Sequence, residues 1–65
     1  MKTAPHILTT YHNHETPNYT DTIFQIHCPW EYRELASFET EVAAIHWLEQ
    51  RNLEYVTETF ETWEY

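Results

Sequence analysis

The stretch "LEYVTETFETWEY", from Leu53 to Tyr65, decides the fold because it fits two different periodicities. Strand alternation aligns its odd-numbered residues, with only Glu61 interrupting a pattern of apolar residues and threonines. Three threonines and four aromatic residues favour a pleated surface over a helix, because threonine loses side-chain freedom in a helix. We therefore predict a strand over 53–63. The helical alternative would align four apolar residues: Leu53, Val56, Phe60 and Trp63.

Four more elements are predicted upstream of this stretch. β-branched and aromatic residues mark three strands, and apolar residues at helical spacing mark one helix. The segment "NHETPNY", 13–19, is predicted as a loop. The order βββαβ predicts a single small α+β domain over 1–65, with one helix packed on a mostly antiparallel sheet. The predicted bounds are strands over 6–12, 21–28 and 30–38 and a helix over 41–51.

Local signals define the ends of the predicted helix. Thr40 is a suitable N-cap, and Glu41 places a carboxylate at the positive end of the helix dipole. Arg51 and Asn52 suit the C-terminal end. Five residues form the apolar arc that is expected to face the sheet: Val42, Ala44, Ile45, Trp47 and Leu48.

The residue types exclude the common enzyme signatures. The chain contains no glycine, which phosphate-binding loops and nucleotide fingerprints require where the backbone approaches the ligand. Ser37 is the only serine and has no glycine-built elbow around it. Cys28 follows His27, but neighbouring residues on a strand point to opposite faces, so we expect a buried structural cysteine. We predict no catalytic residues, no enzymatic activity and no cofactor.

A histidine pair is the one candidate for metal binding. In "YHNHE", His12 and His14 would point the same way on an extended segment, with Glu15 and His6 nearby. A complete zinc or nickel site needs further ligands, and no second Cys/His cluster is present. Weak transition-metal binding through His12 and His14 is therefore an alternative, and a polar segment without metal is preferred.

Composition limits the partners and the compartment. Three basic against eleven acidic residues give a formal net charge of −8, which disfavours nucleic acid and anionic membrane surfaces. No apolar run approaches the roughly 20 residues of a spanning helix, and "MKTAPHILTT" does not resemble a secretory signal. A single cysteine excludes an internal disulfide framework. These features favour a cytoplasmic setting.

The number of aromatic residues favours self-association. Three Trp, five Tyr and three Phe are more than one helix on a small sheet can cover. A 65-residue domain also buries only about 60% of the surface of its unfolded chain, so its stability alone is marginal. We therefore expect a homodimer or a higher oligomer.

The expected function is protein binding without catalysis, as an adaptor or inhibitor of a basic partner. If the odd-numbered face of the last strand packs on the helix, its even-numbered face exposes alternating acidic and apolar residues. Alternatively, these glutamates only keep a terminal edge strand soluble and block edge-to-edge pairing. The candidate partner-binding residues are Glu54, Val56, Glu58, Phe60, Trp63, Glu64 and Tyr65, with Glu31 and Glu34.

A narrower alternative is a phage-type inhibitor that mimics nucleic acid and blocks a host nuclease, polymerase or defence protein. Residues on one face of a strand recur about every 6.6 Å, whereas duplex DNA carries one charge per roughly 1.7 Å. Mimicry would therefore require further acids beside the last strand. Glu31, Glu34, Glu39 and Glu41 could supply them if the third strand and the start of the helix lie there.

Overall fold

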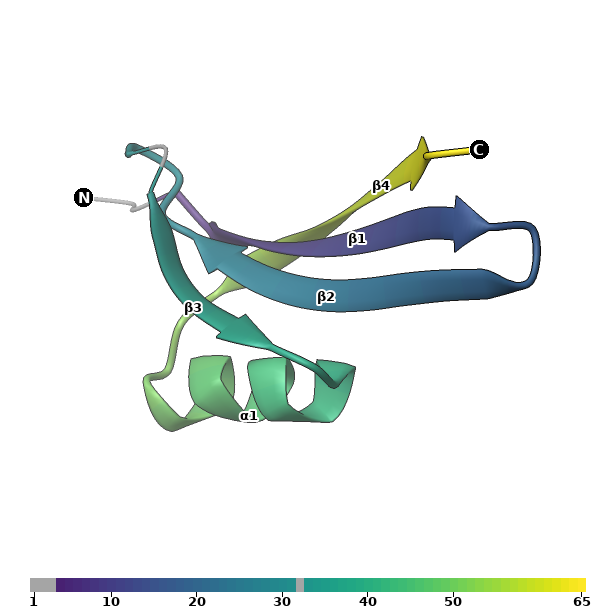
Figure 1. The fold of residues 1–65 in the computed structure, drawn as a ribbon. Helices are drawn as coiled ribbons and strands as arrows, with labels where there is room; N and C mark the ends of the chain where they lie inside the picture. The colour runs from purple at the N-terminus through teal and green to yellow at the C-terminus, as the bar shows by residue number, and fades with distance from the viewer. Residues whose placement is uncertain (1–3, 32) are drawn as a thin grey trace.

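A computed structural model of the chain describes residues 4–31 and 33–65 (Figure 1). The strands form one four-stranded sheet in the order β3-β2-β1-β4. β2 pairs antiparallel with β1 and with β3, and β4 pairs parallel with β1. The predicted α+β class, the βββαβ order and the C-terminal strand are confirmed. The elements are β1 (His6–Thr16), β2 (Tyr19–His27), β3 (Glu34–Phe38), α1 (Glu41–Gln50) and β4 (Tyr55–Trp63).

The β1–β2 hairpin is longer than the sequence predicted. The chain reverses at Pro17 and Asn18, and the Asn18 backbone N–H donates to the Thr16 hydroxyl at 3.3 Å. Strand pairing resumes immediately, with Thr16 opposite Tyr19 after a register shift. The predicted loop over 13–19 is therefore wrong. A turn of two residues suffices, so most of that segment extends the two strands.

The third strand is shorter than predicted and begins at Glu34 instead of residue 30. Pro29 and Trp30 lie in a turn, and the Arg33 backbone N–H donates to the Glu31 carbonyl at 2.7 Å. This local turn interrupts the alternation that suggested a longer strand. Tyr32, which was part of the predicted strand, lies outside the described residues.

The ends of α1 follow the local sequence. The Thr40 hydroxyl accepts a hydrogen bond from the Ala43 backbone N–H at 3.3 Å, which confirms the predicted N-cap. Asn52 follows the C-cap with φ of 54°, a left-handed conformation that asparagine tolerates. The Arg51 guanidinium lies 4.0 Å from the ring centre of Trp47.

The core is small and lies between α1 and the sheet. Its fully buried side chains come from β1, β2 and one face of α1: Leu8, Ile26, Ala44 and Leu48. Val42 was expected in this apolar face but is 78% exposed. At about 100° per residue, Val42 lies roughly 200° around the helix from Ala44, so it points away from the sheet. Further apolar residues pack around the core: Phe24, Leu35, Phe38, Ile45, Trp47, Leu53 and Tyr55.

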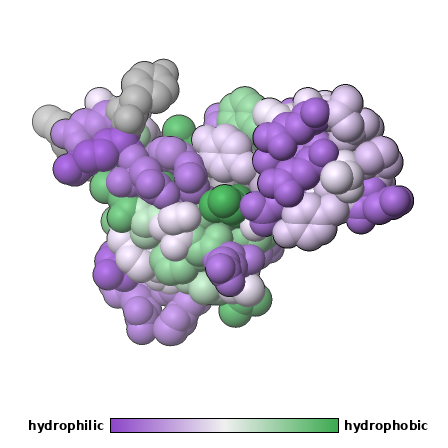
Figure 2. Space-filling view, viewed as in Figure 1, coloured by the Kyte–Doolittle hydropathy of each residue, from purple (hydrophilic) through white to green (hydrophobic). Residues whose placement is uncertain are grey.

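The helix covers only part of one face of the sheet. It lies over β2 and β3, while the β1–β2 hairpin and β4 extend well beyond it (Figure 1). The molecule is correspondingly elongated, with extents of 46 × 21 × 15 Å. Apolar residues gather between helix and sheet, and the projecting end is mainly polar (Figure 2). Within the described residues, no helix has the length and apolar character needed to span a bilayer.

Candidate functional site

The candidate site lies on β4, an edge strand that α1 does not cover. Leu8 is buried under α1 and pairs with Thr57, so the odd-numbered residues of β4 share the helix side of the sheet. Only Tyr55 of this strand packs against the core, and every residue from Val56 onward is exposed. The condition considered for this strand, that its odd-numbered face packs on the helix, is met only at Tyr55, because α1 lies over β2 and β3.

The other face of the sheet carries a hollow of about 230 Å³. Its aromatic wall is formed by Tyr11 and Phe60, whose rings stack with centroids 5.8 Å apart and planes 19° apart. Thr9, two residues before Tyr11 on β1, also lines the hollow and is only 2% exposed. Glu58 adds a carboxylate beside Phe60. The complete lining is Ile7, Thr9, Tyr11, His27, Cys28, Pro29, Glu58 and Phe60.

His27 and Cys28 belong to the same hollow. Cys28 is a free, buried cysteine, as expected. The two residues were predicted on opposite faces, but Cys28 lies beyond the last residue of β2, where strand alternation no longer applies. The Nε2 atom of His27 is buried without a hydrogen-bond partner among the described residues. The lining of the hollow therefore includes His27, which has one unsatisfied buried nitrogen, and Glu58, which supplies a carboxylate from β4.

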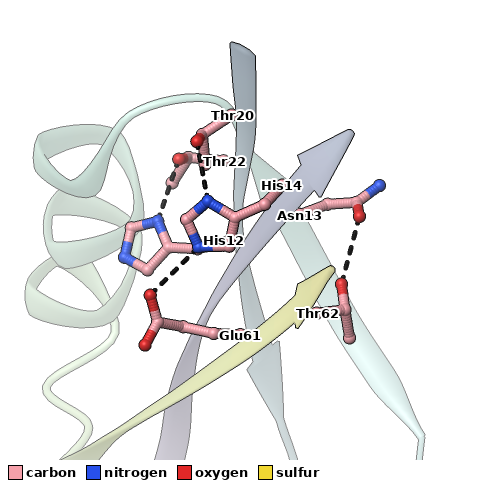
Figure 3. Close-up of polar contacts among 7 residues, drawn as sticks. All are labelled: His12, Asn13, His14, Thr20, Thr22, Glu61 and Thr62. Atoms are coloured by element: carbon pink, nitrogen blue, oxygen red, sulfur yellow. Dashed lines mark hydrogen bonds and ion pairs between the residues drawn. The ribbon is translucent and has the colours of Figure 1, made fainter. Parts of the chain in front are cut away.

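A cluster of polar contacts occupies the helix side of the projecting end (Figure 3). His12 Nδ1 lies 3.0 Å from the Thr22 hydroxyl, and His14 Nδ1 lies 2.9 Å from the Thr20 hydroxyl. His14 Nε2 lies 3.1 Å from a carboxylate oxygen of Glu61. These contacts join β1 to both neighbouring strands. We call these five residues the distal cluster.

Trp63 extends the distal cluster and stands on the opposite face from Phe60. Its ring stacks on His14 with centroids 4.9 Å apart and planes 13° apart. Phe60 and Trp63, both candidate binding residues of β4, therefore lie on opposite faces of the sheet. Phe60 borders the hollow, whereas Trp63 packs on the histidine that links β1 to β4.

The distal cluster does not provide a metal site of three ligands. His12 and His14 do share one side of the sheet, as predicted, but both ring nitrogens of His14 already face Thr20 and Glu61. His6 lies at the other end of β1, against Trp30. In the described part of the chain, no three Cys, His, Asp or Glu side chains are grouped to hold a metal ion. The alternative of metal binding lacks a third ligand there.

The predicted acidic residues do not form one surface. Glu31 and Glu34 lie at the β3 edge, and β2 and β1 separate β3 from β4 by about 14 Å. Glu31 is also paired with Arg33 at 3.3 Å. Glu39 borders a second hollow of about 360 Å³ near the β3 edge, together with Asp21. The acidic residues that were candidates to flank β4 thus lie near the opposite edge of the sheet.

The remaining candidates lie at the two ends of β4. The Glu54 carbonyl accepts a hydrogen bond from the His6 backbone N–H at 2.8 Å, just before the strand begins. The Glu64 carboxylate accepts one from the Asn13 amide at 3.3 Å. Tyr65 is 65% exposed. Val56, Glu58 and Phe60 are therefore the predicted residues that stand together on the uncovered face.

Sequence reasoning missed the contribution of β1 to the hollow. Ile7, Thr9 and Tyr11 alternate along a strand that was predicted, so their common face was visible in the sequence. Their position beside Glu58 and Phe60 depends on parallel pairing of β1 with β4. Nothing in the local sequence specifies that pairing.

Comparison of the chain with protein-family models, with curated protein sequences and with solved structures found no match. The candidate functions therefore rest on the arrangement of the chain's own residues.

Proposed function

We propose that the protein is a non-enzymatic binding module for a basic protein, and that it holds a lysine or arginine of that partner at the hollow beside Glu58. The observation that carries the proposal is the position of a carboxylate next to the stacked Tyr11–Phe60 pair, on the face of the sheet opposite α1. Aromatic residues commonly anchor protein interfaces, and charges accelerate the encounter.

The chemistry of the hollow suits a cationic side chain. Glu58 supplies a carboxylate, and the exposed ring of Phe60 supplies an aromatic face that attracts a cation. The formal net charge of −8 favours a basic partner at long range. A cytoplasmic location fits the single, unpaired and buried Cys28, and it is part of the proposal.

Mimicry of nucleic acid has weaker support than binding of a basic side chain. Glu58 and Glu64 lie on one face of the sheet, about 20 Å apart along the strand, and Glu61 lies on the other. That spacing is far wider than the phosphate spacing of a duplex. The acids of β3 do not fill the gap, because they lie at the opposite edge.

The experiment that tests the proposal is capture of proteins from lysate on immobilised protein, repeated at low and high salt. We expect a basic protein to bind, and to bind less as salt shortens the Debye length from about 10 Å at 0.1 M. Glu58→Gln and Phe60→Ala should reduce its capture. Glu49→Gln makes the same charge change at an exposed position of α1, and it should not reduce capture.

Binding kinetics then distinguish the anchoring role of Phe60 from the electrostatic role of Glu58. Phe60→Ala should mainly raise the off-rate because it removes buried contact area, and Glu58→Gln should mainly lower the on-rate and weaken its salt dependence. If Glu49→Gln reduces binding as much as Glu58→Gln, only net charge matters and the hollow is not the site.

A further inference from the structure

The outer edge of β4 presents unpaired backbone groups. Even-numbered residues of this segment point their backbone N–H and C=O groups toward β1. The Glu54 carbonyl accepts a hydrogen bond from the His6 N–H, and the Glu64 N–H donates to the His14 carbonyl. Backbone direction alternates along a strand, so the odd-numbered residues from Tyr55 to Trp63 direct their N–H and C=O groups outward. No strand within the described residues pairs with that edge.

This edge lacks most of the usual protection against pairing with another strand. Natural edge strands are commonly short, bulged or interrupted by proline or lysine. β4 has nine residues from Tyr55 to Trp63, contains neither proline nor lysine, and pairs with β1 without a register shift. The other edge strand, β3, has five residues and does contain a shift. Only the glutamates of β4 oppose edge-to-edge pairing.

We propose that two copies of the chain pair antiparallel through β4, centred on Phe60, and form one continuous eight-stranded sheet. Because odd-numbered residues point their backbone outward in both copies, odd residues must pair with odd and even with even. This pairing forms about twelve intermolecular backbone hydrogen bonds over 55–65. It also places both helices on the same face.

The glutamates select this register. With Phe60 at the centre, Glu58 lies opposite Thr62 of the second copy, Glu61 opposite Thr59, and Glu64 opposite Val56. No carboxylate then faces another directly, and like charges directly opposite are destabilising.

The neighbouring registers are less favourable. A pairing centred on Glu58 or on Glu61 sets that residue against its own copy, and one centred on Thr59 sets Glu54 against Glu64. A pairing centred on Thr57 leaves the end of β4 unpaired. The Phe60 register is therefore the longest one without opposed acids.

Apolar residues reinforce the same register. Tyr11 pairs with Ile23 on one side and with Phe60 on the other, and Ile23 and Phe60 are 38% and 51% exposed. In the paired sheet, the two Phe60 side chains meet where opposite Cα atoms are only about 4.5 Å apart. The result is one apolar row across both copies on the face away from the helices. The hollows beside Glu58 remain open on that face.

This inference goes beyond the proposed function and uses the outer edge of β4, although Phe60 belongs both to the hollow and to the centre of the proposed pairing. The two kinds of binding respond to salt in opposite directions. Two copies of net charge −8 repel each other, so salt should tighten the dimer, whereas it should weaken a complex with a basic protein. Loss of one behaviour does not imply loss of the other.

Sedimentation measurements provide the first test. We expect a dimer whose dissociation constant falls between about 50 mM and about 500 mM salt. Thr59→Lys should lower the dissociation constant about fivefold, because the new cation faces Glu61 of the second copy, and Thr59→Glu should raise it about as much. Gln50→Lys and Gln50→Glu make the same net charge changes on α1, and they should have smaller effects.

Cysteine cross-linking tests the register directly. In a Cys28→Ala background, Glu58→Cys and Thr62→Cys proteins should each cross-link poorly alone and form a disulfide when mixed, because the two positions face each other across the proposed pairing. Circular dichroism confirms that each variant is folded. A monomer at all concentrations and salts, or single variants that cross-link as fast as the mixture, would overturn the proposal.

Discussion

At the end of the sheet where β1 begins, α1 covers β2 and β3, and Leu8, Ile26 and Leu48 are almost completely buried. At the far end, α1 does not cover the strands, and the side-chain contacts between them include the distal cluster and the stacked Trp63. The first region is held mainly by apolar burial. The second is held by strand pairing, polar contacts and aromatic stacking.

The difference follows from the lengths of the elements. The ten residues of α1 span about 15 Å, whereas the eleven residues of β1 span about 36 Å. One helix of this length leaves more than half of the long strands without cover. α1 is therefore too short to cover either face of the far end.

The largest expected effect concerns the covered region. Leu48→Ala should lower the free energy of unfolding by about 2–5 kcal/mol, because Leu48 is fully buried between α1 and the sheet. Ile45→Ala should cost less, since Ile45 is only partly buried. Urea denaturation at one fixed protein concentration measures both, because self-association would make stability depend on concentration.

Val42→Ala is the control for that comparison. Val42 lies on the same helix but is 78% exposed, so its loss should change stability by less than about 0.5 kcal/mol. Equal losses for Leu48→Ala and Val42→Ala would mean that α1 packs through a different face.

The covered region was the more predictable of the two. The apolar spacing of α1, the Thr40 cap and the alternation of β1, β2 and β4 depend on local sequence, and these elements were found. Val42 was misplaced because the predicted apolar arc was too wide for a helix that contacts the sheet along Ala44 and Leu48. Local pattern identifies an element more reliably than it identifies the contacting face.

The candidate site was less predictable because it depends on strand order. Glu58 and Phe60 were identified on one face of the last strand, and the structure keeps them together. Tyr11 was missed and Glu31 was misplaced, since each depends on which strands become neighbours. The long hairpin was missed because Pro17 and Asn18 make a tight turn without glycine.

A smaller effect is expected in the uncovered region. Trp63→Ala should cost about 0.5–1 kcal/mol, because it removes the ring stacked on His14 from a site that is 58% exposed. The loss should be local. Amide hydrogen exchange should become faster at His14 and Asp21, whose backbone groups face the neighbouring strands at this end, while Leu8 should keep its protection.

Trp30→Ala provides a matched control for the change at Trp63. Trp30 is similarly exposed, at 62%, and also pairs with a histidine, but that histidine is His6 at the covered end. Its removal should leave exchange at His14 and Asp21 unchanged. If both substitutions accelerate exchange at the far end equally, the two regions do not open independently.

The smallest effect concerns the polar contacts at the far end on the face of the sheet that points away from α1. The Thr62 hydroxyl donates to the Asn13 side-chain oxygen at 3.1 Å, and the Asn13 amide donates to Glu64 at 3.3 Å. Thr62→Val keeps the β-branched shape that suits a strand and removes only the hydroxyl. Because all of these groups compete with water, we expect a change below about 0.5 kcal/mol, close to that of Thr57→Val on the other face. A loss above about 1 kcal/mol for Thr62→Val alone, measured by urea denaturation, would show that this exposed polar chain, and not the stacked ring of Trp63, holds β4 to β1 at the far end.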